Sequence, residues 1–384
     1  MWGDGMLKAY IASVEMLKID RHYDKSYVDM ALEVIDAVLN GVGLTPSELD
    51  YIIVSTAFNS LLTHQVGSSY ILAQYLGVKN VNVASVEAGE ASGAAALDYA
   101  ASLVKSGKAS KVLVVGFEKM SEYPSWIVNR EYSKILNYMV EGIKGVTPPD
   151  YAAIIMKEYM SKYNVTREDV FKWSVKMHEN ASKNPYAQLP FKISKDSYVK
   201  SLVMSDPITM HDSFPVGDGA AAALIVGDGF TNNAPKELVE LVDVESSVNL
   251  PLYLREDLTV FEATAKSLSK LTSKHRVSVT KDMALNVYDT YNIYGLITLE
   301  SLGVAERGKA HEVIDEMPYL NVGGGLKARG HPVGATPLYQ LGELYKLMTE
   351  GFAGMKYDGE YGIIHSMSGP DNTSWLVLLR RCVR

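Results

Sequence analysis

The stretch Tyr319–Thr336 constrains this chain more than any other, because it joins three consecutive glycines to a Gly-His-Pro triplet and a helix start. Glycines allow tight turns and a close approach of the backbone to a ligand. Pro332 fixes its own φ and pushes His331 away from helical geometry. The apolar residues that follow predict a helix to about Met348. The sequence therefore predicts a stiff loop that presents one imidazole, a group suited to acid–base chemistry near neutral pH.

Strand and helix patterns alternate along the first part of the chain and return in its last third. Short apolar, β-branched runs predict strands at 9–14, 51–57, 81–86 and 111–117. Helical spacing of apolar residues predicts helices at 27–39, 67–76 and 91–106. Such alternation is typical of an α/β fold.

A design repeats between the two ends of the chain. Ser92 opens a predicted helix that is followed by a strand at 112–115, and Gly334 opens one that is followed by a strand at 362–365. Glu90 and His331 lie on the equivalent loops before these helices. We therefore expect an internal duplication of a βαβ-type half and expect the two loops to meet at one pocket. The predicted domains are an N-terminal half (1–120 and 205–232), a loop-rich and helical excursion (121–204) and a C-terminal half (233–384).

Composition excludes several classes of function. With a net charge of −8 over 384 residues, the chain lacks the basic character that a nucleic-acid-binding protein needs. Its one cysteine, Cys382, rules out a disulfide framework and a cysteine-based metal site within one chain, and favours the reducing cytoplasm. No apolar stretch reaches the roughly 20 residues of a membrane helix, and no signal peptide is visible. We expect no metal site and no membrane partner.

The motif Asn321-x-x-Gly-Gly-x-x-x-x-Gly-His-Pro-x-Gly-Ala-Thr336 resembles the histidine loop of thiolases, enzymes that make or break β-ketoacyl-CoA thioesters. Stretches at 85–93, 184–187, 218–222, 287–303 and 362–369 also resemble thiolase segments, so the similarity covers nearly the whole chain. It implies the thiolase fold, five αβαβα layers built from two duplicated βαβ-rich halves. It also implies an acyl-CoA substrate with no covalently bound cofactor.

The resemblance extends to assembly. Thiolases form homodimers or homotetramers. Some archaeal thiolases work with a hydroxymethylglutaryl-CoA synthase and a small zinc-ribbon/OB-fold protein, so partners of that kind are expected here.

The departures from the thiolase pattern fall on the catalytic positions. Glu90 occupies the position of the nucleophilic cysteine, and Tyr288 replaces the histidine of a His-Asp motif. In the last loop, Ser366 beside His365 aligns with the second cysteine. Of the main catalytic groups, only His331 is kept. We expect a site formed by these five residues, with acyl-CoA contacts from Ser92, Gly93, Gly330, Gly334 and Gly369.

Glu90 has three interpretations. Its carboxylate could cap the following helix in a site that no longer works. It could act as a base or proton relay, or as a nucleophile that forms a mixed anhydride. Three functions follow from these interpretations. The chain is an enzyme that acts on acetyl-CoA or acetoacetyl-CoA by acyl transfer or Claisen chemistry, or a catalytically inactive subunit that binds CoA esters or scaffolds a complex. The third alternative is a thiolase fold that serves another acyl carrier.

Overall fold

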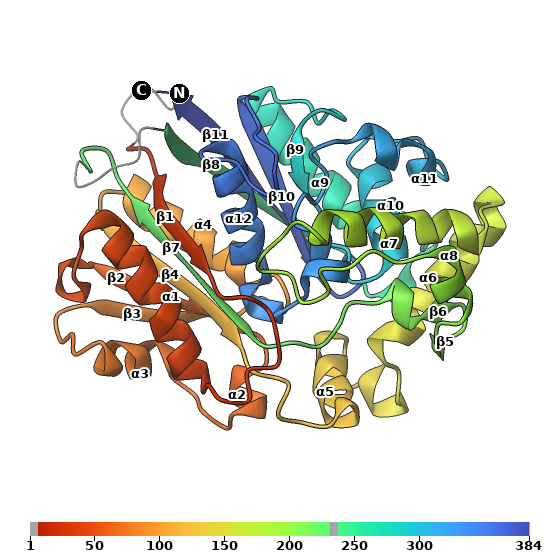
Figure 1. Cartoon of the computed structure of the whole chain (residues 1–384), viewed down its shortest axis with the longest axis horizontal. Helices are drawn as coiled ribbons and strands as arrows, with labels where there is room; N and C mark the ends of the chain where they lie inside the picture. The colour runs from red at the N-terminus through yellow and green to blue at the C-terminus, as the bar shows by residue number, and fades with distance from the viewer. Residues whose placement is uncertain (1–6, 231–236, 384) are drawn as a thin grey trace.

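The computed structural model describes residues 7–230 and 237–383. Within them, nine strands form one mixed sheet in the order β3-β2-β4-β7-β1-β8-β11-β10-β9 (Figure 1). The strands are β1 (Tyr10–Met16), β2 (Tyr51–Ser55), β3 (Asn82–Val86), β4 (Lys111–Glu118), β7 (Gly219–Val226), β8 (Glu237–Val248), β9 (Ala284–Asn286), β10 (Tyr361–Ser368) and β11 (Thr373–Val383). The four strands expected in the first part of the chain are thus confirmed as β1 to β4.

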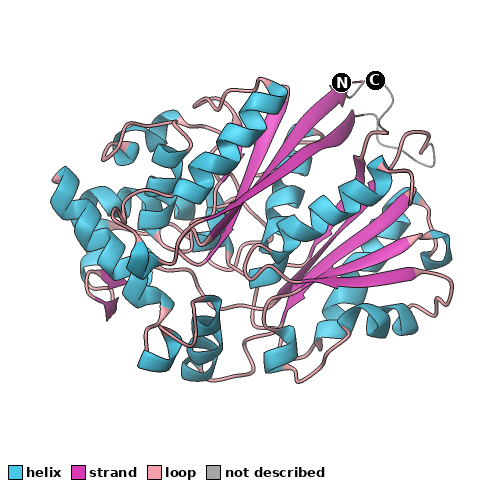
Figure 2. Cartoon of the chain, turned by 180° about the vertical axis from the view of Figure 1, so that it is seen from behind, coloured by secondary structure: helices cyan, strands magenta, loops and turns pink. Residues whose placement is uncertain are grey.

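The sheet consists of two halves with the same internal order. In the first half, β2 lies parallel between β3 and β4, and β7 and β1 follow antiparallel. In the second half, β9 pairs in parallel with β10 and with an isolated bridge at Leu320, and β11 and β8 follow antiparallel. The expected duplication is therefore confirmed strand by strand. The halves join edge to edge where β1 pairs with β8, and Figure 2 shows them as two groups of strands.

Helices cover both faces of each half and meet in the middle. Helices α1 (Tyr27–Val42) and α3 (Ser68–Tyr75) pack on the outer face of the first half, and α9 (Glu262–His275) packs on the outer face of the second. The equivalent helices α4 (Ser92–Lys105) and α12 (Thr336–Met348) contact each other and strands of both halves. Together with α10 (Asn292–Ser301), these helices complete the expected thiolase-type arrangement of five alternating layers (Figure 1).

Side-chain alternation along the strands explains the layers. On β7, Ala221 and Ala223 belong to the core around α4 and α12, whereas Ala220 and Ala222 face the core around α1. Successive strand residues point to opposite faces, so a strand covered on both sides is apolar at every position. The fully buried run of β7 therefore follows directly from the layered architecture.

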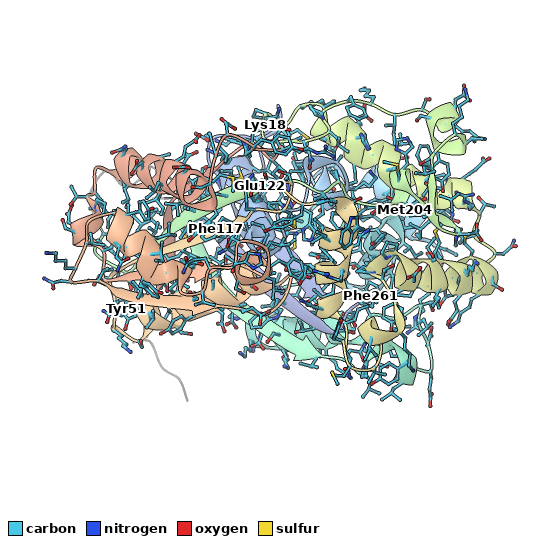
Figure 3. All side chains as sticks on the ribbon, turned by 90° about the horizontal axis from the view of Figure 1, so that it is seen from below. Lys18, Tyr51, Phe117, Glu122, Met204 and Phe261 are labelled. Atoms are coloured by element: carbon cyan, nitrogen blue, oxygen red, sulfur yellow. The ribbon has the colours of Figure 1, made fainter. Side chains whose placement is uncertain are left out.

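The segment between β4 and β7 forms a largely helical excursion beside the second half. It contains α5 (Ser125–Tyr132), α6 (Pro148–Tyr163), α7 (Arg167–Ala181), α8 (Lys195–Val199) and a small two-stranded sheet of β5 (Val203–Ser205) and β6 (Ile208–Thr209). In Figure 3, Met204 marks this sheet, while Phe117 and Phe261 lie inside the two halves. Two short helices, α2 (Asn59–Leu62) and α11 (Ala310–Val313), complete the chain. None of the helices in the described ranges has the length and apolar character needed to cross a membrane.

Candidate active site

The His331 loop, residues 319–336, is a rigid connection between the second-half sheet and α12. A π-helical turn at Gly325–Arg329 is followed by Gly330 with φ 109°, where a Cβ atom would lie 2.7 Å from Ile19. His331 is fully buried, and its Nδ1 lies 2.7 Å from Thr336 Oγ1. The contact with Thr336 therefore holds the imidazole in place through Nδ1 and leaves Nε2 for other partners.

A buried carboxylate holds this loop against the first half. Glu118, at the end of β4, accepts hydrogen bonds of 2.9 Å from the backbone N–H groups of Ala57, Phe58 and Gly334. Burial raises its pKa from 4.5 to about 7, although these backbone donors oppose the rise. The side chain is fully buried, and its bond to Gly334 links the first half to the His331 loop three residues after His331.

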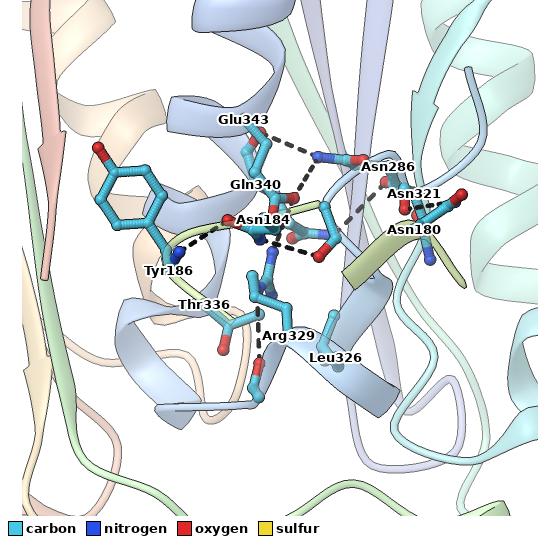
Figure 4. Close-up of polar contacts among 12 residues, drawn as sticks. Asn180, Asn184, Tyr186, Asn286, Asn321, Leu326, Arg329, Thr336, Gln340 and Glu343 are labelled. Atoms are coloured by element: carbon cyan, nitrogen blue, oxygen red, sulfur yellow. Dashed lines mark hydrogen bonds and ion pairs between the residues drawn. The ribbon is translucent and has the colours of Figure 1, made fainter. Parts of the chain in front are cut away.

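A polar network supports the loop from behind (Figure 4). Arg329 forms a buried ion pair of 3.0 Å with Glu343 of α12. Asn286 of β9 donates to the same carboxylate over 3.0 Å, and Asn184 donates to the backbone carbonyl of Gly323 over 2.8 Å. These contacts attach the loop to α12, β9 and the excursion at once.

The Glu90 loop, residues 85–93, is built by local hydrogen bonds. The Ser92 hydroxyl accepts a hydrogen bond from Ala88 N–H over 2.9 Å and donates to the Gly89 carbonyl over 2.5 Å. Gly89 has φ 59°, a conformation that favours glycine. This turn carries the Glu90 side chain inward, where it is 2 % exposed.

Glu90 and His331 meet, as the duplication predicted. Glu90 Oε1 lies 3.5 Å from His331 Nε2 and accepts hydrogen bonds from the hydroxyls of Tyr132 and Tyr288. The same hydroxyls lie 2.8 Å and 3.1 Å from Nε2, respectively. Glu90 Oε2 accepts a hydrogen bond of 2.6 Å from Gly369 N–H. One carboxylate oxygen, two phenols and one imidazole nitrogen thus form a compact buried cluster.

The Glu90 side chain does not cap α4 in this structure. Helix α4 begins after Ala91, and no side-chain hydrogen bond caps it among the described residues. The carboxylate instead bonds to the two phenols and to the Gly369 N–H, which lie on other elements. The backbone of Glu90 thus lies directly before the start of α4, while its side chain bonds to the polar cluster.

Protonation states in this cluster follow from burial and charge. Burial lowers the pKa of His331 against the opposing effect of Glu90, so the imidazole is neutral near pH 7. Burial, together with the nearby charge of Glu90, raises the pKa of Tyr132 and Tyr288 well above 10. Both phenols therefore keep their protons and act as hydrogen-bond donors. The arrangement can move a proton between a carboxylate, an imidazole and an outside molecule.

A narrow pocket leads to Glu90. Its volume is about 10 Å³, room for about one water molecule. It is lined by Glu90, Tyr132, Ile135, Leu136, Pro148, Thr290, Tyr291, Tyr294, Gly369 and Pro370. The walls are mainly apolar or aromatic, with the carboxylate as the charged group. This lining is typical of small-molecule sites, but the volume is well below the roughly 300–1,000 Å³ of such sites.

The other residues expected at the site lie apart from the Glu90 cluster. His365 Nε2 lies 3.1 Å from Thr264 Oγ1, and His365 Nδ1 accepts a hydrogen bond of 3.3 Å from Tyr288 N–H. Burial lowers the pKa of His365 to about 3. Ser366 Oγ is buried and has no hydrogen-bond partner in the described part of the chain.

The five residues expected to contact acyl-CoA divide into two groups. Gly369 lines the pocket, and its N–H meets Glu90. Ser92, Gly93, Gly330 and Gly334 are buried within the two loops and do not line the pocket. Gly93 allows the close approach of α4 to α12, because an added Cβ atom would lie 3.0 Å from the Gly334 carbonyl.

Sequence reasoning missed two residues at the centre of the site. Tyr132 comes from α5 in the excursion, where no motif marked it. Ser368 Oγ accepts a hydrogen bond of 3.3 Å from Glu90 N–H, two positions after the expected Ser366. Since alternate strand residues share a face, Ser366 and Ser368 lie on the same side of β10, and only Ser368 reaches the Glu90 loop.

Comparisons with known proteins agree with this architecture. Residues 9–228 match the family model described as thiolase, N-terminal domain, and residues 245–381 match the model described as thiolase C-terminal domain-like. An acetyl-CoA acetyltransferase from Methanocaldococcus jannaschii is 33 % identical over 345 residues, covering 85 % of this chain and 86 % of the relative. One from Methanothermobacter thermautotrophicus is 28 % identical, covering 97 % and 99 %.

Solved structures share the fold at lower identity. The "Ltp2-ChsH2(DUF35) aldolase" superimposes with a TM-score of 0.82 at 20 % identity and covers 97 % of each chain. The Acat5 thiolase from Ascaris suum in complex with coenzyme A gives a TM-score of 0.76 at 16 % identity, covering 98 % of this chain and all of that one. At these identities the likeness concerns the fold.

Proposed function

Given that this chain belongs to the thiolase family, we propose that it binds an acyl-CoA thioester and transfers a proton at the carbon next to the thioester carbonyl, with Glu90 as the base. One observation carries the proposal. The Glu90 carboxylate lines the pocket, with two phenols and the His331 imidazole around one of its oxygens. CoA serves as part of the substrate and not as a covalently bound cofactor.

The proposed chemistry avoids a covalent acyl-enzyme. Thiolate attack requires a cysteine, and this site has Glu90 there. Attack by the carboxylate would form a mixed anhydride, a covalent intermediate that a proton transfer does not need. Oε1 accepts hydrogen bonds from both Tyr132 and Tyr288, so one of these phenols turns to the substrate before Oε1 takes a proton.

Deuterium exchange tests the proposal directly. Acetyl-CoA incubated with the protein in D2O should gain deuterium at its methyl group, as read by NMR. Glu90→Gln should slow this by about 100-fold or more, because the base is lost. Glu300→Gln is the matched control, since Glu300 is a buried glutamate that accepts a hydrogen bond of 2.5 Å from Tyr159 away from the pocket.

The result also separates the enzyme from its non-catalytic alternative. Binding of acetyl-CoA without any exchange would favour a subunit that only binds CoA esters or scaffolds a complex. Acetoacetyl-CoA cleavage by the unmodified protein at the rate of an ordinary thiolase would contradict the non-covalent route and require another nucleophile.

A second candidate is aldol cleavage of a β-hydroxyacyl-CoA. A site with a base and phenol donors but no thiol favours it, and one structure with this fold is named an aldolase. The base would take the hydroxyl proton, the bond between the α and β carbons would break, and its electron pair would form the enolate. Reprotonation gives an acyl-CoA and a carbonyl compound. Release of a carbonyl compound from a β-hydroxyacyl-CoA when no free CoA is added distinguishes this reaction from thiolysis, which consumes free CoA.

A homodimer is part of the proposal, with β3 as its contact. Strand β3 is an edge of the sheet, its residues are partly or fully exposed, and none is charged. Such an unprotected edge invites pairing with a second copy. Val83→Lys should shift the protein toward monomer in light scattering. A mass that this substitution leaves unchanged would place the contact elsewhere. A wild-type mass twice that of a dimer would indicate a dimer of dimers.

Further partners and location also remain proposals. We propose a small zinc-ribbon/OB-fold protein and a hydroxymethylglutaryl-CoA synthase as partners. The name of the Ltp2-ChsH2(DUF35) structure, which joins two proteins, supports a search for a small one. The single cysteine supports a cytoplasmic location. Co-purification of the tagged full chain with these two candidates tests the assembly.

A further inference from the structure

The pocket exposes only part of the acid–base cluster. Glu90 and Tyr132 line it, whereas Tyr288 and His331 do not and are fully buried behind them. A group placed in the pocket can therefore contact the Glu90 carboxylate and the Tyr132 phenol, whereas the His331 imidazole does not line the pocket.

We infer that Tyr132 is a catalytic residue: its hydroxyl donates a hydrogen bond to the thioester oxygen while Glu90 removes the neighbouring proton. The inference rests on the proposed function and adds to it the group that stabilises the negative charge. Among the residues that line the pocket, Tyr132 is the one whose hydroxyl also bonds to Glu90 and lies 2.8 Å from His331 Nε2.

Packing holds the Tyr132 ring in place without using its hydroxyl. The ring lies 5.1 Å from Phe58 and 5.5 Å from Phe214, measured between centroids. Phe58 belongs to the first half and Phe214 to the excursion, so the ring is fixed from two sides. The hydroxyl is left with only the polar cluster and the pocket to face, which suits a pre-oriented donor.

The Tyr132 hydroxyl can turn to a substrate while Glu90 keeps other hydrogen-bond donors. When Tyr132 moves its hydrogen bond to the thioester oxygen, Oε1 still accepts from Tyr288 and Oε2 still accepts from Gly369. Burial and the Glu90 charge keep the pKa of Tyr132 high, so its proton is present to donate.

The step balances with no other reactant. Glu90 takes the proton from the α carbon, and the C–H electron pair forms a carbon–carbon double bond. The carbonyl π pair moves to the thioester oxygen, which the Tyr132 O–H meets. Return of the proton from Glu90 reverses each change.

This assignment makes His331 a positioning residue. Its Nδ1 is held by Thr336, and its Nε2 faces the hydroxyls of Tyr132 and Tyr288. It orients both phenols toward Glu90 and reaches the substrate only through them.

The test compares a ground-state ligand with an enolate mimic. In the mimic, a nitroalkyl group replaces the acyl group of CoA, and its nitronate carries the charge where the enolate would. By calorimetry on the full chain, Tyr132→Phe should weaken binding of the mimic by about 100-fold and that of acetyl-CoA by less than about threefold. The rate of deuterium exchange into acetyl-CoA should also be lower in Tyr132→Phe than in the wild type, in parallel with the weaker binding of the mimic. The matched control Tyr159→Phe removes a phenol bonded to a buried glutamate elsewhere and should change neither.

The outcomes separate the two proposals. Wild-type exchange that survives in Tyr132→Phe overturns the role of Tyr132 and leaves the proposed function standing. Suppose that the wild type shows no deuterium exchange but still binds the mimic about 100-fold more tightly than Tyr132→Phe does. That result overturns the proposed function and supports Tyr132 as the hydrogen-bond donor. Should Tyr132→Phe unfold, 3-fluorotyrosine at position 132 replaces it. Its fluorine resonance should shift more with the mimic than with acetyl-CoA, and equal shifts or no shift would overturn the inference.

Discussion

Glu118 offers the clearest quantitative test of how the two halves hold the site. Its buried carboxyl binds Gly334 of the His331 loop and two backbone N–H groups of the first half, and its pKa rises from 4.5 to about 7. A raised folded-state pKa means that the folded protein binds the proton more tightly than the unfolded chain does. The stability that comes from this proton is complete below about pH 4.5 and is lost as the pH rises through about 7.

The magnitude follows from the two pKa values. The difference between 4.5 and about 7 corresponds to roughly 3 kcal/mol in the free energy of unfolding. Most of this, roughly 2.5 kcal/mol, is lost between pH 5 and pH 8. Glu118→Gln cannot titrate, so its stability should lack this component. We expect the stability advantage of the wild type over the variant to shrink by roughly 2.5 kcal/mol over this range.

Urea unfolding of both proteins at several pH values between 5 and 8 measures the effect. The comparison cancels other buried groups such as Asp289 and Asp371, because both proteins contain them. A difference between wild type and Glu118→Gln that stays constant, or grows with pH, would refute the argument.

The remaining predictions concern the nucleophile position, the loop network and the glycines. Glu90→Cys should be acetylated by acetyl-CoA, because the start of α4 that carries a carboxylate also favours a thiolate; mass spectrometry of a folded variant that gains no acetyl group would contradict this. Glu343→Ala should destabilise the protein by about 3–5 kcal/mol, since it leaves the buried Arg329 charge unpaired, and Arg329→Met in the same chain should recover part of the loss in urea unfolding. Gly334→Ala should cost about 1–3 kcal/mol, because its Cβ would lie 2.6 Å from the Thr56 backbone. Gly227→Ala, whose Cβ would meet Val104 only at 3.4 Å, should stay within about 0.5 kcal/mol, and equal melting temperatures for the two would be evidence against this packing account.

Local sequence patterns were enough to predict much of the fold. The strands β1 to β4 and the helices before and after them follow apolar periodicity, and the equivalence of the Glu90 and His331 loops followed from the helices that they precede. The long strand β11 escaped prediction, although it pairs with β8 and β10 along most of its length. Its pairing partners are distant in sequence, and burial on both faces removes the alternation that marks a strand.

Only those residues of the site that lie in a sequence motif could be predicted. Glu90, Tyr288 and His331 lie in motifs and meet in space. Tyr132 lies in the excursion, and its approach depends on how α5 packs against Phe58 and Phe214. The choice of Ser368 over Ser366 depends on how far β10 extends before it turns, a distance that no local pattern encodes.

The middle layer has a consequence for how the chain reaches its working state. The hydrogen bond between Gly369 and Glu90 spans 279 residues of sequence, and it exists only when α4 and α12 lie side by side between the halves. Each half can form its local strand–helix units alone, but contacts of such long range are slow to form. Proton exchange should therefore return later than helical circular dichroism during refolding. Fragments cut within the excursion should regain the proposed exchange only when mixed, so that this exchange reports the docking of the two halves and not the folding of either half.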